Sequence, residues 1–163
     1  MNWTQVCYQY DGTYPGFLSC VFDCWVNREE PVEFHTPEDM CCSLYPLRAV
    51  DTDREHAMRV YRSFAKFGAE GARLAVRTFL TCLPDKELDL LTLIRRGLRE
   101  GDRVRLDLSD PVMAKVNLAL TKMWTEWDHL KGFIRFSDLD GVLVGEIEPK
   151  NRVLPLLASH FAA

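Results

Sequence analysis

Hydrophobic and polar residues alternate at the start of the chain and then repeat at helical spacing. Residues 5–10, QVCYQY, have the period of two that is typical of a strand, and Asp11-Gly12-Thr13 supplies turn-forming residues. The next hydrophobic side chains share one helical stripe that extends to about residue 27: Phe17, Val21, Cys24 and Trp25. We therefore predict a strand, a turn and a helix, followed by a second short strand at residues 31–34.

The central part of the chain is predicted to form a loop and then three helices. Residues 36–51 contain two prolines and no clear hydrophobic period, so we expect a loop there. Thr52 and Glu55 fit a capping box, which predicts that the first helix begins at this point. The hydrophobic spacing predicts the second and third helices at about residues 71–83 and 85–99.

The clearest helix comes next, because Asp110 is a good N-cap and Pro111 a good first residue. Its hydrophobic residues repeat at steps of three and four: Val112, Val116, Leu120, Met123, Trp127 and Leu130. Burial of each large side chain contributes about 1.5–3 kcal/mol, so this stripe is expected to be a main anchor of the fold. We expect Gly132 to end the helix.

A β-hairpin and a short helix are predicted after Gly132. Residues 133–136 and 142–148 have strand-like composition, and an Asp-Gly turn lies in the loop between them. A short apolar helix is expected to run to His160 and Phe161.

Helices that do not alternate with the few strands predict an α+β fold. We expect a small mixed or antiparallel sheet, made of the N-terminal strand and the C-terminal hairpin, packed against five to six helices. The chain has 163 residues, of which 47% are hydrophobic, so residues 1–163 are expected to form a single domain with one core.

Several functional classes are excluded by composition and by missing motifs. No run of eighteen apolar residues and no signal peptide occurs, so we expect a cytoplasmic protein without a membrane partner. Catalytic-serine, P-loop and dinucleotide-binding motifs are also missing, as is a run resembling a uracil-DNA glycosylase active site, and no cofactor is expected.

Six cysteines occur, at positions 7, 20, 24, 41, 42 and 82. Their spacing contains no CxxC pair, and position 27 is Asn, where a radical-SAM frame starting at Cys20 would need a third cysteine. We interpret the cysteines as small, reduced core residues rather than metal ligands or disulfides. The alternative is a metal site that joins Cys41, Cys42 and His35.

Charge is distributed unevenly within a net charge of −4. Residues 1–47 carry one basic and seven acidic residues, whereas residues 48–105 carry thirteen basic and nine acidic ones. This pattern favours a local basic face, and we expect the following residues to contact phosphates: Arg95, Arg96, Arg99, Arg103, Arg105 and Lys131. The alternative for the arginine run is an ordinary solvated helix end.

Three separated segments resemble the bacterial "probable DNA metabolism protein" family. They are YDGTYPGFLSCVF (10–22), HLKGFIRF (129–136) and EIEPKNRVLPLLASHF (146–161), and the similarity covers essentially the whole chain. Members of that family sit beside a putative DNA-modification or repair radical-SAM protein, and some are fused to a uracil-DNA glycosylase-like domain. The resemblance marks five motif positions: Tyr10, Asp11, Gly12, Gly132 and Phe133.

The chain also departs from the pattern of the family that it resembles. The family typically continues beyond this C-terminus with further strands, so we expect this chain to be a C-terminally truncated form. Members often have an Asp-His-Asn-like stretch where this chain has Lys150, Asn151 and Arg152, which counts against an acid/base role for that loop.

His129 has two interpretations. It lies near the end of the strongest predicted helix, where the helix dipole and Asp128 favour a charged imidazolium. It can act as a phosphate contact or proton donor together with Lys131 and Arg135, or it can cap the last carbonyl groups of the helix.

The residues around Arg135 also leave alternatives open. Phe133 and Phe136 can stack on bases while Arg135 binds phosphate, although at least one phenylalanine is expected in the core. Glu146 and Glu148 can share a proton or a metal ion, but we favour a salt bridge from one of them to Arg135. Asp11 can bind a ligand or can simply form the turn.

These observations predict an accessory protein of DNA modification or repair. Its partners would be DNA, a radical-SAM protein or a uracil-DNA glycosylase-like domain. One alternative is a non-catalytic structural subunit. The other is a nucleic-acid-processing enzyme whose candidate catalytic residues are His129, Arg135, Glu146, Glu148 and His160.

Overall fold

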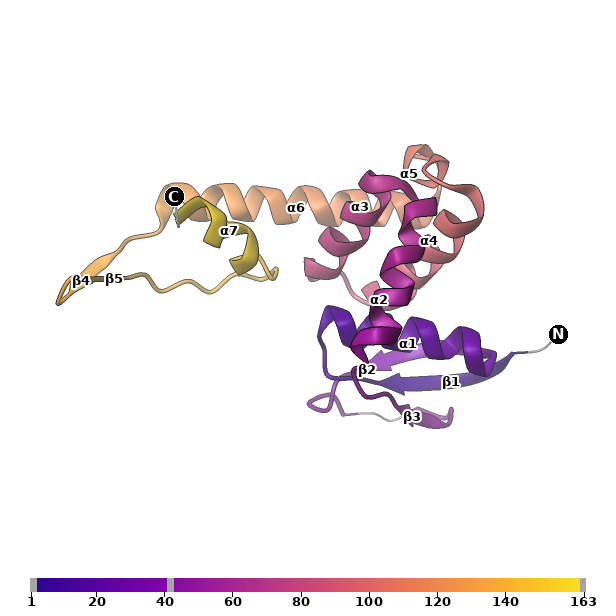
Figure 1. The fold of residues 1–163 in the computed structure, drawn as a ribbon. Coiled ribbons are helices and arrows are strands. Elements are labelled where there is room, and N and C mark those ends of the chain that lie inside the picture. The colour runs from indigo at the N-terminus through magenta and orange to yellow at the C-terminus, as the bar shows by residue number, and fades with distance from the viewer. Residues whose placement is uncertain (1–2, 41–42, 162–163) are drawn as a thin grey trace.

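The computed structural model describes residues 3–40 and 43–161. It confirms the α+β class, with a three-stranded sheet at the N-terminal end, a body of helices and a two-stranded hairpin near the C-terminal end (Figure 1). The predicted single sheet is wrong in its arrangement, because the hairpin pairs with no N-terminal strand and the N-terminal sheet is parallel.

Strand β1 (Thr4–Gln9) lies at the centre of the N-terminal sheet, between β2 (Glu29–His35) and β3 (Leu47–Ala49). Helix α1 (Tyr14–Asn27) connects β1 to β2, and the hydroxyl of Thr13 caps it by accepting a hydrogen bond from the Gly16 amide. This confirms the predicted strand, turn and helix. The loop predicted for residues 36–51 is wrong at β3, whose three exposed residues are too few to show a hydrophobic period.

The pleat of β1 gives the N-terminal sheet two different faces. Alternate residues Val6, Tyr8 and Tyr10 enter the main core, where Tyr10 and Phe17 of α1 lie 6.5 Å apart between ring centroids. Cys7 points to the opposite face and is fully buried there. Helix α1 therefore covers one face of the sheet only.

Four α-helices and a 3₁₀ turn form the middle of the chain: α2 (Arg54–Ser63), η1 (Phe64–Lys66), α3 (Gly68–Leu80), α4 (Lys86–Glu100) and α5 (Arg103–Leu106). The predicted cap of the first of them is wrong by one residue. Asp53 caps α2 by accepting hydrogen bonds from the amides of Glu55 and His56. The hydroxyl of Thr52 instead donates to Asp11, because the N-terminal turn lies beside it.

Helix α6 (Pro111–Phe133) confirms the predicted start, since Asp110 accepts a hydrogen bond from the Met113 amide. Its predicted end is wrong, because Gly132 lies inside the helix and Ile134 is the C-cap. The strand predicted at residues 133–136 is accordingly absent, and the first hairpin strand begins at Ser137.

The C-terminal hairpin consists of β4 (Ser137–Leu139) and β5 (Val142–Val144), joined at the predicted Asp-Gly turn. It extends beyond the end of α6, away from the helical body, whereas α7 (Leu154–Phe161) lies alongside α6 (Figure 1). A second, smaller core lies between α6 and α7, and its buried residues are Met123, Val153 and Leu157. No helix in the described part of the chain is both long and apolar enough to span a bilayer.

Candidate nucleic-acid interface

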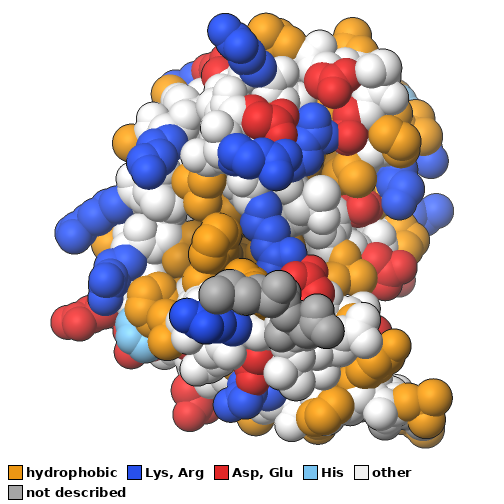
Figure 2. All heavy atoms as spheres, turned by 90° about the vertical axis from the view of Figure 1, so that its right-hand side faces the viewer, with side chains coloured by type: hydrophobic (Ala, Val, Ile, Leu, Met, Phe, Trp, Pro, Cys, Tyr) orange, Lys and Arg blue, Asp and Glu red, His pale blue; other side chains and the backbone are white. Residues whose placement is uncertain are grey.

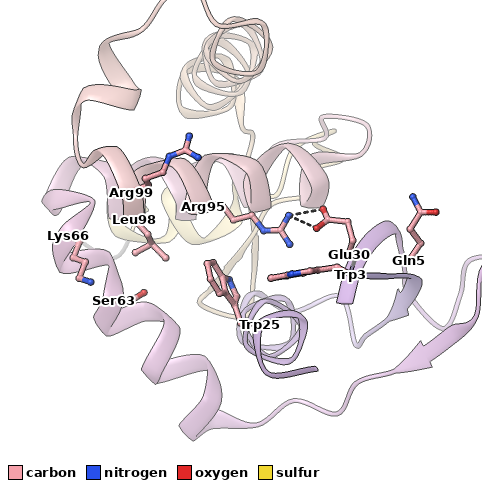
Figure 3. Close-up of a pocket in the computed structure, with 9 residues that line it drawn as sticks. All are labelled: Trp3, Gln5, Trp25, Glu30, Ser63, Lys66, Arg95, Leu98 and Arg99. Atoms are coloured by element: carbon pink, nitrogen blue, oxygen red, sulfur yellow. Dashed lines mark hydrogen bonds and ion pairs between the residues drawn. The ribbon is translucent and has the colours of Figure 1, made fainter. Parts of the chain in front are cut away.

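An open groove of about 1120 Å³ lies where the start of β1 meets α1, η1 and α4. Its walls carry aromatic, aliphatic, basic, acidic and uncharged polar side chains: Trp3, Gln5, Trp25, Glu30, Ser63, Lys66, Arg95, Leu98 and Arg99 (Figure 3). These residues come from four separated stretches of sequence, 3–5, 25–30, 63–66 and 95–99, so the groove exists only in the folded chain.

Two tryptophans form the apolar part of the groove. The rings of Trp3 and Trp25 meet edge to face, with centroids 5.9 Å apart and planes at 77°. The guanidinium carbon of Arg95 lies 5.3 Å from the Trp3 ring centroid, so the arginine covers one ring (Figure 3). Half of Trp25 is exposed to solvent, which leaves aromatic surface available to a flat ligand.

Arg95 is held in place by acidic and sulfur neighbours. Its Nη1 donates to both carboxylate oxygens of Glu30, at 2.7 and 2.9 Å, and its Nη2 lies 3.7 Å from the Cys24 sulfur. Burial raises the pKa of the Cys24 thiol to about 11 although Arg95 acts against this shift. Cys24 therefore stays a neutral thiol near pH 7, and Arg95 positions Trp3 while its charge is largely balanced by Glu30.

A second hollow of about 290 Å³ continues the groove along α2, since Trp25, Ser63 and Leu98 line both. Arg59 stands at its edge, with its guanidinium carbon 5.2 Å from the Phe22 ring centroid. Neither Arg59 nor Lys66 has an acidic partner among the described residues. Figure 2 shows Lys and Arg side chains around exposed apolar surface on this face of the molecule. The combined groove is thus aromatic at its base and cationic at its rim.

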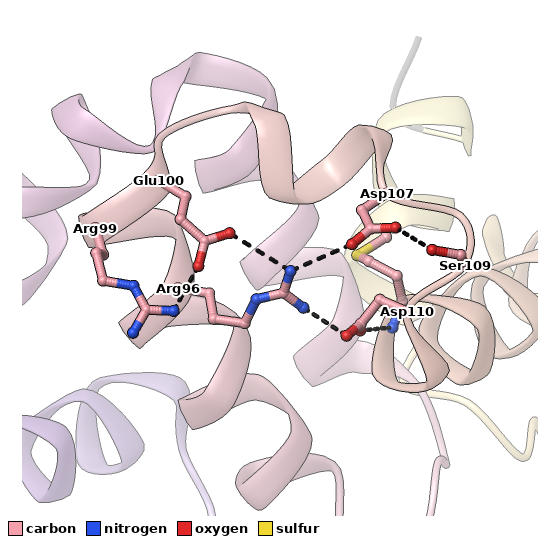
Figure 4. Close-up of polar contacts among 7 residues, drawn as sticks. Arg96, Arg99, Glu100, Asp107, Ser109 and Asp110 are labelled. Carbon is pink, nitrogen blue, oxygen red and sulfur yellow. Dashed lines mark hydrogen bonds and ion pairs between the residues drawn. The ribbon is translucent and has the colours of Figure 1, made fainter.

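The arginine run predicted to contact phosphates is divided by the fold. Arg95 and Arg99 line the groove, whereas Arg96 turns to the other side of α4 and pairs with Asp110, Asp107 and Glu100 (Figure 4). Arg99 also contacts Glu100, at 2.5 Å, and this hydrogen bond holds the pKa of that carboxyl below its ordinary value.

Arg103 and Arg105 also differ in whether they have an acidic partner. Arg105 makes two hydrogen bonds to Asp102, at 2.9 and 3.0 Å. Arg103 is exposed and has no ion pair within the described part of the chain. The charge run thus marks a helix end whose cations are mostly neutralised, and within the run it is Arg95 and Arg99 that lie beside the tryptophans.

His129 and Lys131 lie on α6, away from the groove. His129 is exposed on a shallow surface with Trp124 and Trp127, and its ring meets Phe133 edge-on at 6.3 Å. Its imidazole makes no capping hydrogen bond within the described residues. Lys131 pairs with Asp128 at 3.0 Å, and its amine lies 3.7 Å from the Trp127 ring centroid.

Arg135, Glu146 and Glu148 line a different hollow, of about 690 Å³, between the end of α6 and the hairpin. The favoured salt bridge to Arg135 is not found among residues 3–40 and 43–161, and the side chains of Arg135, Glu146 and Glu148 are all exposed. His160 makes an edge-on ring contact with Phe161, 4.9 Å between centroids. The structure therefore brings together three of the five candidate catalytic residues and leaves His129 and His160 apart from them.

Phe133 and Phe136 are both exposed, by 80% and 45%, so the expectation that one would enter the core is wrong. They leave the core because residues 133–136 end a helix instead of forming a strand.

The N-terminal motif forms a hydrogen-bonded turn. Asp11 accepts hydrogen bonds from the Thr13 amide and from the hydroxyls of Thr13 and Thr52. Partial burial raises its pKa, but these hydrogen bonds outweigh that effect and hold the pKa of Asp11 below its ordinary value. Gly12 has a φ of 74°, which suits glycine. The contacts match the turn-forming interpretation of Asp11.

Sequence reasoning misses both tryptophans as site residues. The helical spacing predicts Trp25 on the inward stripe of α1, although it lies half exposed at the C-terminal end of that helix. A signal exists in the sequence, since Trp25 follows Cys24 directly and one of two adjacent helical residues must turn away from the stripe centre. The interpretation of cysteines as core residues is confirmed for Cys20 and Cys24, which are buried in the main core. It is wrong for Cys82, which is exposed because it lies just after the end of α3. Cys41 and Cys42 lie outside the described residues.

Residues 84–163 match the family described as a domain of unknown function, DUF4130. No curated protein and no solved structure matches the chain. The matched region begins just before α4, so it contributes the α4 wall of the groove, while both tryptophans precede it.

Proposed function

We propose that this protein binds single-stranded nucleic acid in the Trp3–Trp25 groove, as an accessory of DNA modification or repair. The observation that carries the proposal is exposed indole surface along one groove together with cations, Arg59 and Lys66, that have no acidic partner in the described part of the chain. Proteins that bind single strands combine the same two elements, because bases stack on aromatic rings while Lys and Arg follow the phosphates. The resemblance to the DNA-metabolism family agrees with this assignment.

The groove favours single strands over duplexes. A base can stack on Trp25 only when its face is exposed, and the bases of a duplex already stack on each other. Arg59 and Lys66 flank the aromatic base of the groove and are available for phosphates. The net charge of −4 weakens attraction of nucleic acid to the rest of the surface, which confines binding to this face.

Titration of a fluorescent single-stranded oligonucleotide across a salt series tests the proposal. The slope of log K against log salt concentration is negative, and each lost phosphate contact reduces its magnitude by about 0.7 for single strands. Trp25→Ala should cost about 1–3 kcal/mol of binding free energy, which is a loss of about 5- to 150-fold in affinity. Lys66→Glu should weaken binding and reduce the salt slope.

Two variants outside the groove serve as matched controls. Phe133→Ala removes an aromatic ring that is 80% exposed, and Lys122→Glu reverses the charge of an exposed lysine on α6. Both should keep wild-type affinity. Equal losses in Lys66→Glu and Lys122→Glu, or a duplex bound as tightly as the single strand, would contradict binding in this groove.

The exposed C-terminal hairpin supports the second part of the proposal, which is that the protein also binds a protein partner. Leu139, Val142, Leu143 and Val144 are exposed by 47–67%, which is unusual for aliphatic residues clustered on one two-stranded sheet. We propose that this hairpin is the contact surface for a protein partner, and the family resemblance names a radical-SAM protein as the first to test. Co-purification of both full chains should be lost with Leu143→Asp and kept with Leu118→Asp, an equally apolar exposed position on α6.

A further inference from the structure

Three side chains of different chemistry meet on the face of the N-terminal sheet that α1 does not cover. Cys7 of β1 and Glu33 of β2 are register partners in the parallel pair, and His35 follows Glu33 by two residues, so all three project from one face. A register shift between Val6 and Cys7 brings Cys7 level with Glu33. The backbone of two paired strands thus fixes the three positions.

The donor atoms of these residues converge closely. The Cys7 sulfur lies 3.3 Å from Glu33 Oε2, and the same oxygen lies 3.1 Å from His35 Nε2. One ligand atom from each residue lies within 4.8 Å of the others. Tetrahedral zinc, with bonds of about 2.0–2.3 Å, places its ligands about 3.3–3.7 Å apart, so small side-chain rotations suffice to admit an ion.

The burial of the cluster suits a metal site with access to solvent. Cys7 is fully buried, while the side chains of His35 and Glu33 are 19% and 46% exposed. Hydrogen bonds from His35, then from Cys7 and Ser43, hold the pKa of Glu33 below its ordinary value.

We propose that Cys7, Glu33 and His35 form a binding site for a divalent transition ion of the zinc type. Sulfur and imidazole donors favour zinc over magnesium or calcium, which prefer oxygen ligands. The described residues thus supply three ligands of a tetrahedral site, whose fourth position is filled by water or another ligand. The site is separate from the tryptophan groove and shares no residue with it.

Cobalt and zinc titrations of the full chain test this site directly. Co²⁺ should bind at one equivalent per chain with a thiolate-to-cobalt charge-transfer band, and Zn²⁺ should displace it. Glu33→Gln and His35→Gln should each weaken Co²⁺ binding at least about 10-fold, as expected for loss of one ligand or its support. Cys82→Ser and His56→Gln, which change another cysteine and another histidine, should bind as the wild type does.

Cysteine variants test whether Cys7 itself supplies the sulfur ligand. Cys7→Ser should abolish the charge-transfer band, and far-ultraviolet circular dichroism shows whether that variant folds; if it does not, the partly exposed His35 and Glu33 variants decide. A Cys41→Ser/Cys42→Ser variant should keep the band. Absence of the band in the wild type, its persistence in folded Cys7→Ser, or unchanged affinity in both His35→Gln and Glu33→Gln would overturn the proposal.

Discussion

Arg152 donates a hydrogen bond from Nη1 to the carbonyl oxygen of Gly12 at 2.7 Å, which joins two residues 140 positions apart. The same guanidinium lies 5.5 Å from the Phe79 ring centroid. Two of the segments that carry the family resemblance, YDGT and EPKNR, therefore meet in space. Their contact ties the N-terminal turn to the segment that leads into α7.

Replacing Arg152 should destabilise the fold modestly. Arg152→Met removes the hydrogen bond and the charge over Phe79 but keeps most of the aliphatic stem. Because Arg152 is exposed, we expect a loss of about 1 kcal/mol in the free energy of unfolding, below the range for buried charged hydrogen bonds. Urea unfolding measures the change. Arg103→Met, at an exposed arginine on α5, should shift the midpoint little.

The hydrogen bonds of Glu126 should make the free energy of unfolding decrease as the pH falls into the acid range. Its carboxylate accepts hydrogen bonds from the amides of Lys150 and Asn151 and from the Asn151 side chain, at 2.7–2.9 Å. Partial burial raises the pKa, but these bonds outweigh that effect and hold the pKa of Glu126 below its ordinary value. Folding therefore favours the ionised form, so its contribution is present above the unfolded pKa of about 4.3 and is lost as pH falls through the folded pKa.

Urea midpoints between pH 7 and pH 3 measure this contribution. Glu126→Gln should be less stable than the wild type at pH 7, and the difference should shrink as the pH falls below about 4.3. Glu148→Gln changes an exposed carboxylate of the same region and serves as the control substitution; it should leave the urea midpoint at pH 7 close to that of the wild type. A gap between Glu126→Gln and the wild type that widens toward pH 3 would show that the assigned direction is wrong.

Asp110 should contribute to stability both as a helix cap and as an ion-pair partner. It accepts the Met113 amide hydrogen at 2.9 Å and receives Arg96 Nη1 at 2.5 Å (Figure 4). Asp110→Ala removes both and should cost about 1–2 kcal/mol, whereas Asp110→Asn retains the cap and should cost less. Chemical denaturation of both variants, alone and combined with Arg96→Met, separates the two effects. The ion pair is supported only if Arg96→Met costs less in Asp110→Ala than in the wild type.

Local signals in the sequence predict most helices and one cap, and they fail where tertiary contacts decide. Asp110-Pro111 is a complete local start signal, and α6 begins there. Thr52 has the right spacing to Glu55 for a cap, but its hydroxyl binds Asp11, which lies 41 residues earlier. A short stretch of sequence around Thr52 does not include Asp11, so local sequence signals cannot predict this hydrogen bond.

The candidate sites show the same division. The basic run on α4 is visible as composition, but only the fold shows that Arg96 turns to Asp110 while Arg95 turns to Trp3. The metal-ligating cluster depends on the parallel register of Cys7 with Glu33, and register between distant strands is set by packing. The sequence identifies His35 as a ligand candidate, but with different partners.

Two glycines in helices should respond in opposite directions to alanine. Alanine is favoured over glycine by about 1 kcal/mol in a helix interior, so propensity alone predicts stabilisation at both. At Gly97 of α4, however, an added Cβ would lie 2.6 Å from the ring of Phe67, which is fully buried. At Gly132 of α6 an added Cβ would meet nothing within 4 Å.

Gly97→Ala should therefore lower the free energy of unfolding by about 1–3 kcal/mol through overpacking, and Gly132→Ala should raise it by about 0.5 kcal/mol. Urea unfolding of both variants decides the matter: if Gly132→Ala destabilises the chain, α6 ends at the glycine, as the sequence predicts, and if Gly97→Ala stabilises it, the Phe67 ring has room to move.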